Sequence, residues 1–235
     1  MPFNDLKAVE KALDDETAAV MLEVIQGEGG VNVGEESFIQ GIEQLCKERN
    51  VLLVVDEIQT GIGRTGKAFA YEHYGISPDI ITVAKGLGNG FPVGGIIAKA
   101  SLKEHFGPGT HGSTFGGNPL AMAASKAVLQ TVFHNDFLQE VREKSMYLKD
   151  LLADKIESFQ FVERITGKGM MIGIHCQTDV SHLVPKLLEK GLIVLSAGSN
   201  VIRLLPPLTI QKEEMVQAVT LLEETFHSES LLHMK

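Results

Sequence analysis

Short apolar runs bounded by polar or glycine-containing stretches indicate where this chain forms strands. Residues 51–55 make one such run and residues 80–83 a second, and both are rich in β-branched side chains. Runs of this kind are typical of strands that are buried on both faces of a parallel sheet. Further strands are predicted at residues 18–24 and near residues 95–98.

Between these strands the apolar positions follow the period of a helix. One helical face before residue 51 collects four apolar side chains, Phe38, Ile42, Leu45 and Cys46. The alternation of strand, helix and strand predicts βαβ units with right-handed crossovers. Residues 107–119 hold five glycines and two prolines and are predicted to form a long loop. Asn118 then suits a helix N-cap, and Pro119 the first helical position.

The second half of the chain has a different pattern, which predicts a smaller α+β unit. Its expected elements are a helix at 136–157, strands near 161–165 and 170–175, a helix at 181–190, strands at 192–195 and 201–205, and a helix at 212–227. The tail from residue 228 to 235 is expected to fray. We place the domain boundary after residue 127, which gives a large domain at 1–127 and a small domain at 128–235.

Composition and charge exclude several classes of function. Of the 235 residues, 44% are hydrophobic and 22% charged, which is ordinary for a globular chain. The net charge of −9 argues against nucleic acid or an anionic membrane as partner. No apolar stretch approaches the ~18 residues that span a bilayer, and the start of the chain lacks the pattern of a signal peptide. Two cysteines form no disulfide framework, so a cytoplasmic location is expected, and no His or Cys cluster suggests a metal.

Two familiar nucleotide-binding motifs occur in the chain, and both lack the context that they need. Residues 61–66 match GxGxxG, but they do not follow their strand directly and no convincing helix comes after them. Residues 61–67 nearly form a P-loop, yet Ala68 stands where a Ser or Thr must bind magnesium. The acidic strand that would serve an ATPase also precedes this loop instead of following it. We therefore reject a dinucleotide-binding or ATPase function.

Asp56 and Lys85 follow the two central apolar runs. Ligands of open α/β sheets bind at the carboxyl ends of strands, so the two side chains can reach one ligand. Pyridoxal phosphate (PLP) requires this pair, a lysine for its aldehyde and a carboxylate for its ring nitrogen. Alone, Asp56 would more often cap a turn and Lys85 would be solvated. The glycines at residues 86–90 favour a close ligand, beside which Lys85 would be partly desolvated.

Further candidate residues lie in loops and in the second half. Glu28 occupies a glycine-rich loop, where a plain surface turn is an equally good interpretation. Arg203 lies within an apolar run, which suggests a partner or an anionic ligand, unless the strand is at an edge and faces water. Ser113 and Thr114 lie in the long glycine-rich loop, where hydroxyls and amides suit a phosphate or simply form turns.

These motifs together resemble the class III (subgroup II) aminotransferases, which are PLP-dependent enzymes of fold type I. The resemblance extends over nearly the whole chain and is strongest for the acetylornithine aminotransferases. It rests on five segments, at residues 25–30, 56–66, 84–86, 111–119 and 203–208. It implies an α/β fold with a partial large domain around a mainly parallel sheet and a small α+β C-terminal domain. The family has a long portion before this point, so we expect the chain to be an incomplete enzyme.

The resemblance also implies a role for each candidate residue. Lys85 would bind PLP covalently, Asp56 would pair with its ring nitrogen, and Gln59 would lie near its ring hydroxyl. Ser113 and Thr114 would bind phosphate, and Thr114 would reach the cofactor of the neighbouring subunit in a homodimer with shared active sites. Arg203 would bind the α-carboxylate of the substrate. Glu28 would neutralise this arginine when the substrate has no second carboxylate.

The implied reaction is transamination of N-acetylornithine with 2-oxoglutarate, a step of arginine biosynthesis. It gives N-acetylglutamate 5-semialdehyde and glutamate. Phe115, where ornithine aminotransferases tend to have Tyr, favours acetylornithine. The alternatives are an ornithine, succinylornithine or 4-aminobutyrate aminotransferase, or an inactive fragment of such an enzyme. No nucleic-acid or membrane partner is expected.

Overall fold

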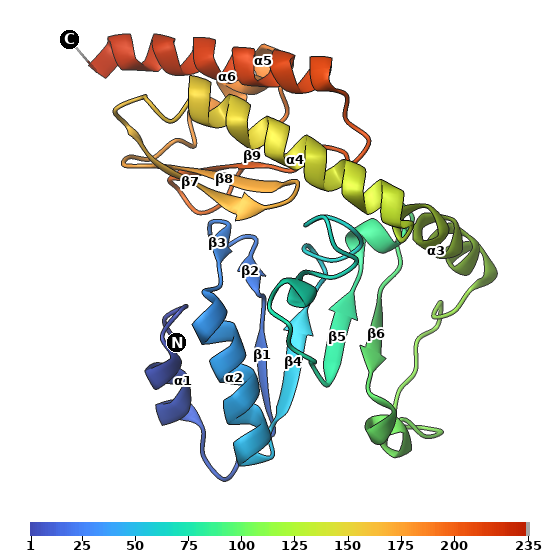
Figure 1. Cartoon of the computed structure of the whole chain (residues 1–235). Coiled ribbons are helices and arrows are strands. Elements are labelled where there is room, and N and C mark those ends of the chain that lie inside the picture. The colour runs from blue at the N-terminus through green and yellow to red at the C-terminus, as the bar shows by residue number, and fades with distance from the viewer. Residues whose placement is uncertain (234–235) are drawn as a thin grey trace. The chain divides into compact units, whose positions relative to one another are not determined.

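A computed structural model of the chain describes residues 1–233 and divides into two compact units (Figure 1). Unit 1 comprises Met1–Val24, Gly34–Gly63 and Lys67–Phe137, and unit 2 comprises Ile25–Val33, Arg64–Gly66 and the chain from Leu138 onward. The sequence places a boundary after residue 127, but this position lies inside a helix of unit 1. Two short segments of the first half also belong to unit 2, because β3 (Asn32–Val33) packs on β7 (Val162–Lys168) and the segment 64–66 contacts Met170 and Arg142.

A four-stranded sheet with the order β1-β4-β5-β6 forms the centre of unit 1. Its strands are β1 (Ala19–Leu22), β4 (Leu52–Asp56), β5 (Ile80–Val83) and β6 (Gly95–Ala98). The first three are parallel, and β6 runs antiparallel to β5. All four predicted strands of the first half are therefore confirmed, in a mainly parallel sheet.

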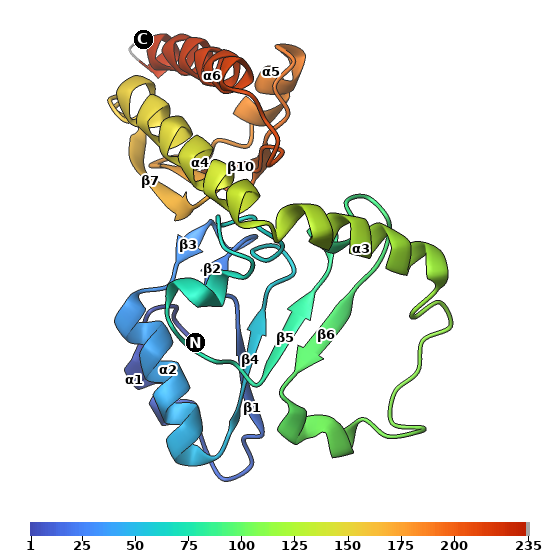
Figure 2. The same cartoon turned by 45° about the vertical axis from the view of Figure 1, so that its right-hand side comes forward.

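Three α-helices and three 3₁₀ turns complete unit 1, and α1 and α2 lie side by side (Figures 1 and 2). They are α1 (Leu6–Ala12), α2 (Glu36–Arg49), α3 (Pro119–Val132), η1 (Ala70–His73), η2 (Lys85–Leu87) and η3 (Ala100–His105). Helix α2 buries the apolar face predicted from Phe38, Ile42 and Cys46. The predicted start of α3 is confirmed, because the Asn118 side chain accepts a hydrogen bond from the amide of Ala121.

The apolar runs predict strands that are buried on both faces, but β4 and β5 are fully buried on one face only. Burial alternates along β4 and β5, and Leu53 and Val55 lie on the more deeply buried face. The opposite face is only half-buried, and the apolar side chains of Met21 on β1 and Ile96 on β6 stay exposed there. Ile97 is exposed as well, although it is on the same face as Ile81. An apolar run is therefore compatible with one fully packed face, which the sequence pattern could not distinguish from two.

Unit 2 contains an antiparallel sheet with the order β7-β8-β10-β9. Its strands are β7 (Val162–Lys168), β8 (Met171–Cys176), β9 (Leu195–Ser196) and β10 (Val201–Leu204). The helices α4 (Asn135–Lys155), α5 (Leu183–Glu189) and α6 (Lys212–His233) lie on one side of it (Figures 1 and 2). The hairpin of β2 (Ile25–Gln26) and β3 (Asn32–Val33) lies on the other side. Every residue of β8 is buried, as expected for a strand covered on both faces.

The expectation of a frayed tail after residue 227 is wrong for residues 228–233, which continue α6. Glu229 is buried and accepts hydrogen bonds from His182 at 2.7 Å and from Lys186 at 2.9 Å. These two contacts join α6 to the region of α5, which the local sequence could not reveal. Residues 234 and 235 lie outside the described residues. No helix that the structure describes has the length and hydropathy of a membrane-spanning segment.

Candidate functional site

Asp56 and Lys85 lie at the same edge of the sheet in unit 1. Asp56 is the last residue of β4, and Lys85 follows the end of β5 by two residues. Because β4 and β5 are parallel neighbours, their carboxyl ends meet at one edge of the sheet. The structure therefore confirms that an acid and an amine follow adjacent strands, as the two apolar runs predicted.

The backbone of Lys85 has an unusual conformation. Its φ is 44°, in the left-handed region that residues other than glycine seldom adopt. Strained backbone of this kind concentrates at functional sites, where the surrounding structure enforces it. The side chain is exposed in this chain. The amine is thus accessible to a ligand.

The turn after β4 is held by two acidic side chains. The Oδ1 atom of Asp56 accepts a hydrogen bond from the amide of Ile58 at 2.8 Å, so this residue also caps the turn. Glu57 is fully buried and accepts hydrogen bonds from the Thr60 hydroxyl at 2.6 Å and from the Tyr71 amide at 2.8 Å. Burial raises the pKa of Glu57. Sequence reasoning missed Glu57, and its only signal was an acid directly beside Asp56.

The other three predicted cofactor residues lie in turns or loops. Gln59 is half-buried in the same turn, whereas Ser113 and Thr114 are exposed in the loop before α3. Thr82 is the register partner of Asp56, so both side chains lie on the same face of the sheet. The Thr82 Oγ1 atom is buried and has no hydrogen-bond partner among the described residues. A primary amine, a carboxylate and several hydroxyls thus form a donor set that fits PLP.

The backbone of the turn itself explains why two of the residues after Lys85 are glycines. A Cβ atom at Gly88 would lie 2.0 Å from the carbonyl oxygen of Phe91, and Gly90 has φ of 104°. Both positions therefore require glycine for the turn alone. A Cβ at Gly86 would make only an ordinary contact, 3.4 Å from Ile62. Close approach of a ligand is thus not needed to explain Gly88 and Gly90.

The GxGxxG segment at residues 61–66 is a folded turn and opens no α-helix. Within unit 2, Arg64 donates from Nη1 to the carbonyl oxygens of Met170 at 3.1 Å and of Pro206 at 2.5 Å. Desolvation lowers the pKa of Arg64 to about 10. Arg142 in turn donates to the carbonyl of Gly66 at 2.7 Å. These contacts explain the motif by packing and support the rejection of a nucleotide site.

Unit 2 contains the second pair of predicted site residues, Glu28 and Arg203. Arg203 lies on β10, between β8 and β9, so it is not an edge-strand charge that faces water. Its side chain is 4% exposed and donates from Nη1 to Oε1 of Glu28 at 2.8 Å, whereas the Glu28 side chain is 76% exposed. A guanidinium on a buried strand is therefore neutralised by a carboxylate that solvent can reach.

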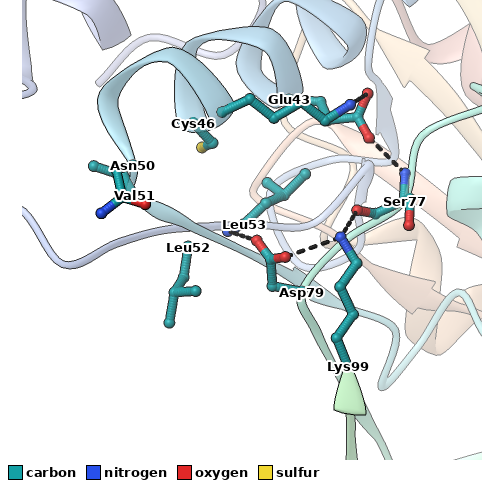
Figure 3. Close-up of a pocket in the computed structure, with 10 residues that line it drawn as sticks. Glu43, Cys46, Asn50, Val51, Leu52, Leu53, Ser77, Asp79 and Lys99 are labelled. Atoms are coloured by element: carbon teal, nitrogen blue, oxygen red, sulfur yellow. Dashed lines mark hydrogen bonds and ion pairs between the residues drawn. The ribbon is translucent and has the colours of Figure 1, made fainter. Parts of the chain in front are cut away.

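A further polar cluster lies at the opposite, amino-terminal edge of the unit 1 sheet (Figure 3). Asp79 accepts hydrogen bonds from the Leu53 amide and the Lys99 ammonium, both at 2.9 Å. Lys99 also donates to the Ser77 carbonyl, and the Ser77 amide donates to Glu43. These groups surround a cavity of about 170 Å³, and their polar atoms form hydrogen bonds with one another. The cluster joins β4, β5 and β6, so we assign it a structural role.

Comparisons with known proteins agree with these observations. The family model of class-III aminotransferases matches residues 2–226. An acetylornithine aminotransferase of Bacillus subtilis (strain 168) is 56% identical over 99% of this chain, and one of Halalkalibacterium halodurans is 52% identical over 98% of it. The chain spans 60% of the length of each of these two relatives.

Solved structures of aminotransferases have the same fold. An ornithine aminotransferase of Toxoplasma gondii, described with partial occupancy of PLP at its active site, has a TM-score of 0.93 and 34% identity; the match covers all of this chain and 57% of that one. An acetylornithine aminotransferase of Elizabethkingia anophelis has a TM-score of 0.89 and 36% identity, over 97% of this chain and 59% of the other. The predicted α/β architecture of fold type I is confirmed.

Proposed function

Because this chain belongs to the class III aminotransferases, we propose that it carries cofactor and substrate residues of a PLP-dependent transamination from N-acetylornithine to 2-oxoglutarate. The observation that carries the proposal is the position of Asp56 and exposed Lys85 at the ends of adjacent parallel strands. Support for the amino donor comes from the relatives named acetylornithine aminotransferase, which reach 56% identity.

Five residues of unit 1 would hold the cofactor. The Nζ atom of Lys85 would bind its aldehyde, and the carboxylate of Asp56 would hold a proton on its ring nitrogen. Gln59 would face the ring hydroxyl, and Ser113 and Thr114 would donate to the phosphate. When bound, PLP supplies a ring that withdraws electrons from the carbon next to the amino group.

Lys85 and Asp56 would have different roles in the reaction: Lys85 would transfer a proton, and Asp56 would hold a fixed negative charge. Once the amine of the substrate replaces it, the Nζ atom of Lys85 is able to take the proton from the amine-bearing carbon and later return one. The exposed position of Lys85 allows this exchange. The Oδ1 atom of Asp56 is fixed by the Ile58 amide, which keeps the carboxylate in place without a change of rotamer during the reaction.

Arg203 would bind the α-carboxylate of 2-oxoglutarate through its planar guanidinium, a geometry suited to carboxylates. Glu28 would stay paired with Arg203 when a substrate lacks a second carboxylate, and would yield to 2-oxoglutarate. This role is supported by the 2.8 Å contact and by the exposure of Glu28, since an exposed carboxylate is able to move without unfolding its surroundings.

The proposal includes a homodimer, because Thr114 would reach the phosphate bound by the neighbouring subunit. The exposure of residues 111–117 in this chain is compatible with such a contact. A reducing cytosol would suit the two free cysteines, Cys46 and Cys176, which are both buried. The partners are then the amino donor, 2-oxoglutarate and a second copy of the chain.

The decisive experiment identifies the lysine that binds PLP. PLP is added to the purified chain, the visible absorption spectrum is recorded, the adduct is reduced with borohydride, and the modified peptide is mapped by mass spectrometry. We expect the label on Lys85, and loss of both the label and turnover in Lys85→Ala. Lys126→Arg, at an exposed position on α3, is the matched control and should keep the label. Label on another lysine, or full turnover by Lys85→Ala, would exclude this function.

The amino donor is tested by comparing kcat/KM for four amines. These are N-acetylornithine, ornithine, N-succinylornithine and 4-aminobutyrate, each with 2-oxoglutarate as acceptor. We expect N-acetylornithine to have the highest value. A higher value for ornithine would assign the chain to the activity named for the structurally similar Toxoplasma gondii enzyme.

A further inference from the structure

Glu28 lies at the tip of the β2–β3 hairpin, and the backbone on either side of it is fixed. The Val31 amide donates to the carbonyl of Gly27 at 3.4 Å. The Nδ2 atom of Asn32 donates to the carbonyl of Gly29 at 2.7 Å. The two neighbours of Glu28 are therefore both tied to the far side of the turn, and the position of Glu28 depends on where that side is held.

Val31 connects this turn to the sheet of unit 2. It is fully buried and has φ of 53°, a conformation that β-branched residues rarely adopt. Its side chain packs on Gly173, where an added Cβ would lie 2.8 Å from the Cβ of Val31. Gly173 is the β8 register partner of Arg203. The strained residue of the turn thus packs against the strand next to the arginine that Glu28 binds.

Thr166 holds Val31 in this place. Its Oγ1 atom donates to the Val31 carbonyl at 2.8 Å and lies 2.8 Å from the Nε2 atom of His175. Since a hydroxyl has one proton, which goes to Val31, the Nε2 atom of His175 must carry the hydrogen of the second bond. His175 is 3% exposed, and its burial lowers its pKa, which favours the neutral ring. The interaction fixes one tautomer of His175.

We infer that Thr166 and His175 are positioning residues, which hold the hairpin so that Glu28 pairs with Arg203 and thereby competes with a carboxylate ligand for that arginine. The inference rests on the proposed carboxylate-binding role of Arg203. It assigns selectivity for the carboxylate ligand to a hydroxyl and an imidazole that do not touch the ligand. We call the contacts of Thr166 with Val31 and His175 the brace. The brace acts through the Val31 carbonyl, whereas the ion pair with Glu28 acts through Nη1 of Arg203.

The test measures the affinity of the full chain for 2-oxoglutarate by calorimetric titration. Glu28→Gln removes the competing charge and is expected to tighten binding by roughly threefold to tenfold. Thr166→Val removes the hydroxyl at similar size and should tighten binding in the same direction by a smaller factor. Thr166→Ser keeps the hydroxyl and should bind as the original chain does. A merely structural defect would weaken binding instead.

Two further variants keep the test decisive. In the double variant Glu28→Gln and Thr166→Val, the second change should add nothing, because both act on the same competitor. If Thr166→Val does not fold, Asn32→Ala loosens the turn at a half-buried position and should also tighten binding. The ¹⁵N resonances of His175 give an independent measurement, with the Nε2–H tautomer expected in the original chain and in Thr166→Ser.

The outcomes separate the inference from the proposed function. If Glu28→Gln binds 2-oxoglutarate no better than the original chain, Glu28 does not compete with the ligand for Arg203 and the inference is wrong, whatever binds the carboxylate. If Glu28→Gln tightens binding but Thr166→Val and Asn32→Ala leave it unchanged or weaken it, the brace alone is wrong. Additive effects in the double variant would also overturn it. The modification of Lys85 by PLP is independent of all these results.

Discussion

Asp56, the last residue of β4, is the register partner of Thr82 on β5, three residues before Lys85. This parallel register brings the carboxylate and the lysine to one edge of the sheet. It also places the Thr82 hydroxyl, which is buried without a hydrogen-bond partner among the described residues, on the face of Asp56. Asp56 thus has a structural role in the turn after β4, beside its proposed role at the cofactor ring, and the two can be separated.

Asp56→Asn should separate them. Asparagine keeps the Oδ1 acceptor for the Ile58 amide but loses the negative charge. We expect the free energy of unfolding to change by less than about 0.5 kcal/mol. Turnover should fall about a hundredfold or more, as it does when a preorganised electrostatic group is removed. Urea unfolding and the transamination rate measure the two effects, and Asp56→Ala is the comparison that loses both. An unchanged rate in Asp56→Asn would contradict the proposed role.

Glu57 should give the stability of the chain a defined dependence on pH. Burial raises its pKa in the folded chain above the ordinary value of 4.5. The stability that comes from the neutral carboxyl is fully present below that ordinary value and is lost as pH rises through the raised one. Glutamine cannot ionise. The melting temperature of Glu57→Gln minus that of the original chain should therefore increase as the pH rises above the ordinary value of 4.5 and through the raised pKa. A difference that is constant over this range would show that the carboxyl does not titrate there.

Gly173→Ala should destabilise unit 2, because the new Cβ would lie 2.8 Å from Val31 and 3.2 Å from the Thr166 hydroxyl. Overpacking of this kind costs about 1–3 kcal/mol. Gly107→Ala is the control, since nothing lies within 4 Å of a Cβ at that position. Denaturant unfolding measures both variants, and adding Val31→Gly, which removes the contacted Cβ, to Gly173→Ala should recover part of the loss. Equal stability of Gly173→Ala and the control would refute this contact.

Both cysteines should be unreactive while the chain is folded. Burial raises the pKa of Cys46 to about 11 and that of Cys176 to about 12. At pH 8, a thiol with a pKa of about 11 is ionised in about one molecule in a thousand, and the thiolate is the reactive form. Titration with Ellman's reagent should therefore detect no rapid thiol in the native chain and two after denaturation. Cys46→Ala would identify the residue if one thiol reacts early in the native state.

Local patterns were sufficient for the strands at whose ends the proposed cofactor residues Asp56 and Lys85 lie. Asp56 and Lys85 could be placed at strand ends because an apolar run and the polar residue that ends it are adjacent in sequence. The N-cap of α3 at Asn118 is local in the same way, since it bonds an amide three residues away. The apolar runs of β4 and β5 predicted more burial than the structure shows. The reason is that the sequence of a strand does not indicate whether other elements cover both faces of its sheet.

The residues alone predicted the four strands of the mainly parallel first sheet and placed an acid and a lysine at two of their ends, but they did not reveal α1, β2 or β3. The folded structure was needed to show that the β2–β3 hairpin belongs to unit 2, that Glu57 is buried, and that Thr166 contacts both Val31 and His175. The pairing of Glu28 with Arg203, 175 residues apart, was suggested by family resemblance and not by the residues themselves. Short-range bonding follows from neighbouring residues, whereas a contact between distant segments exists only once packing has brought them together.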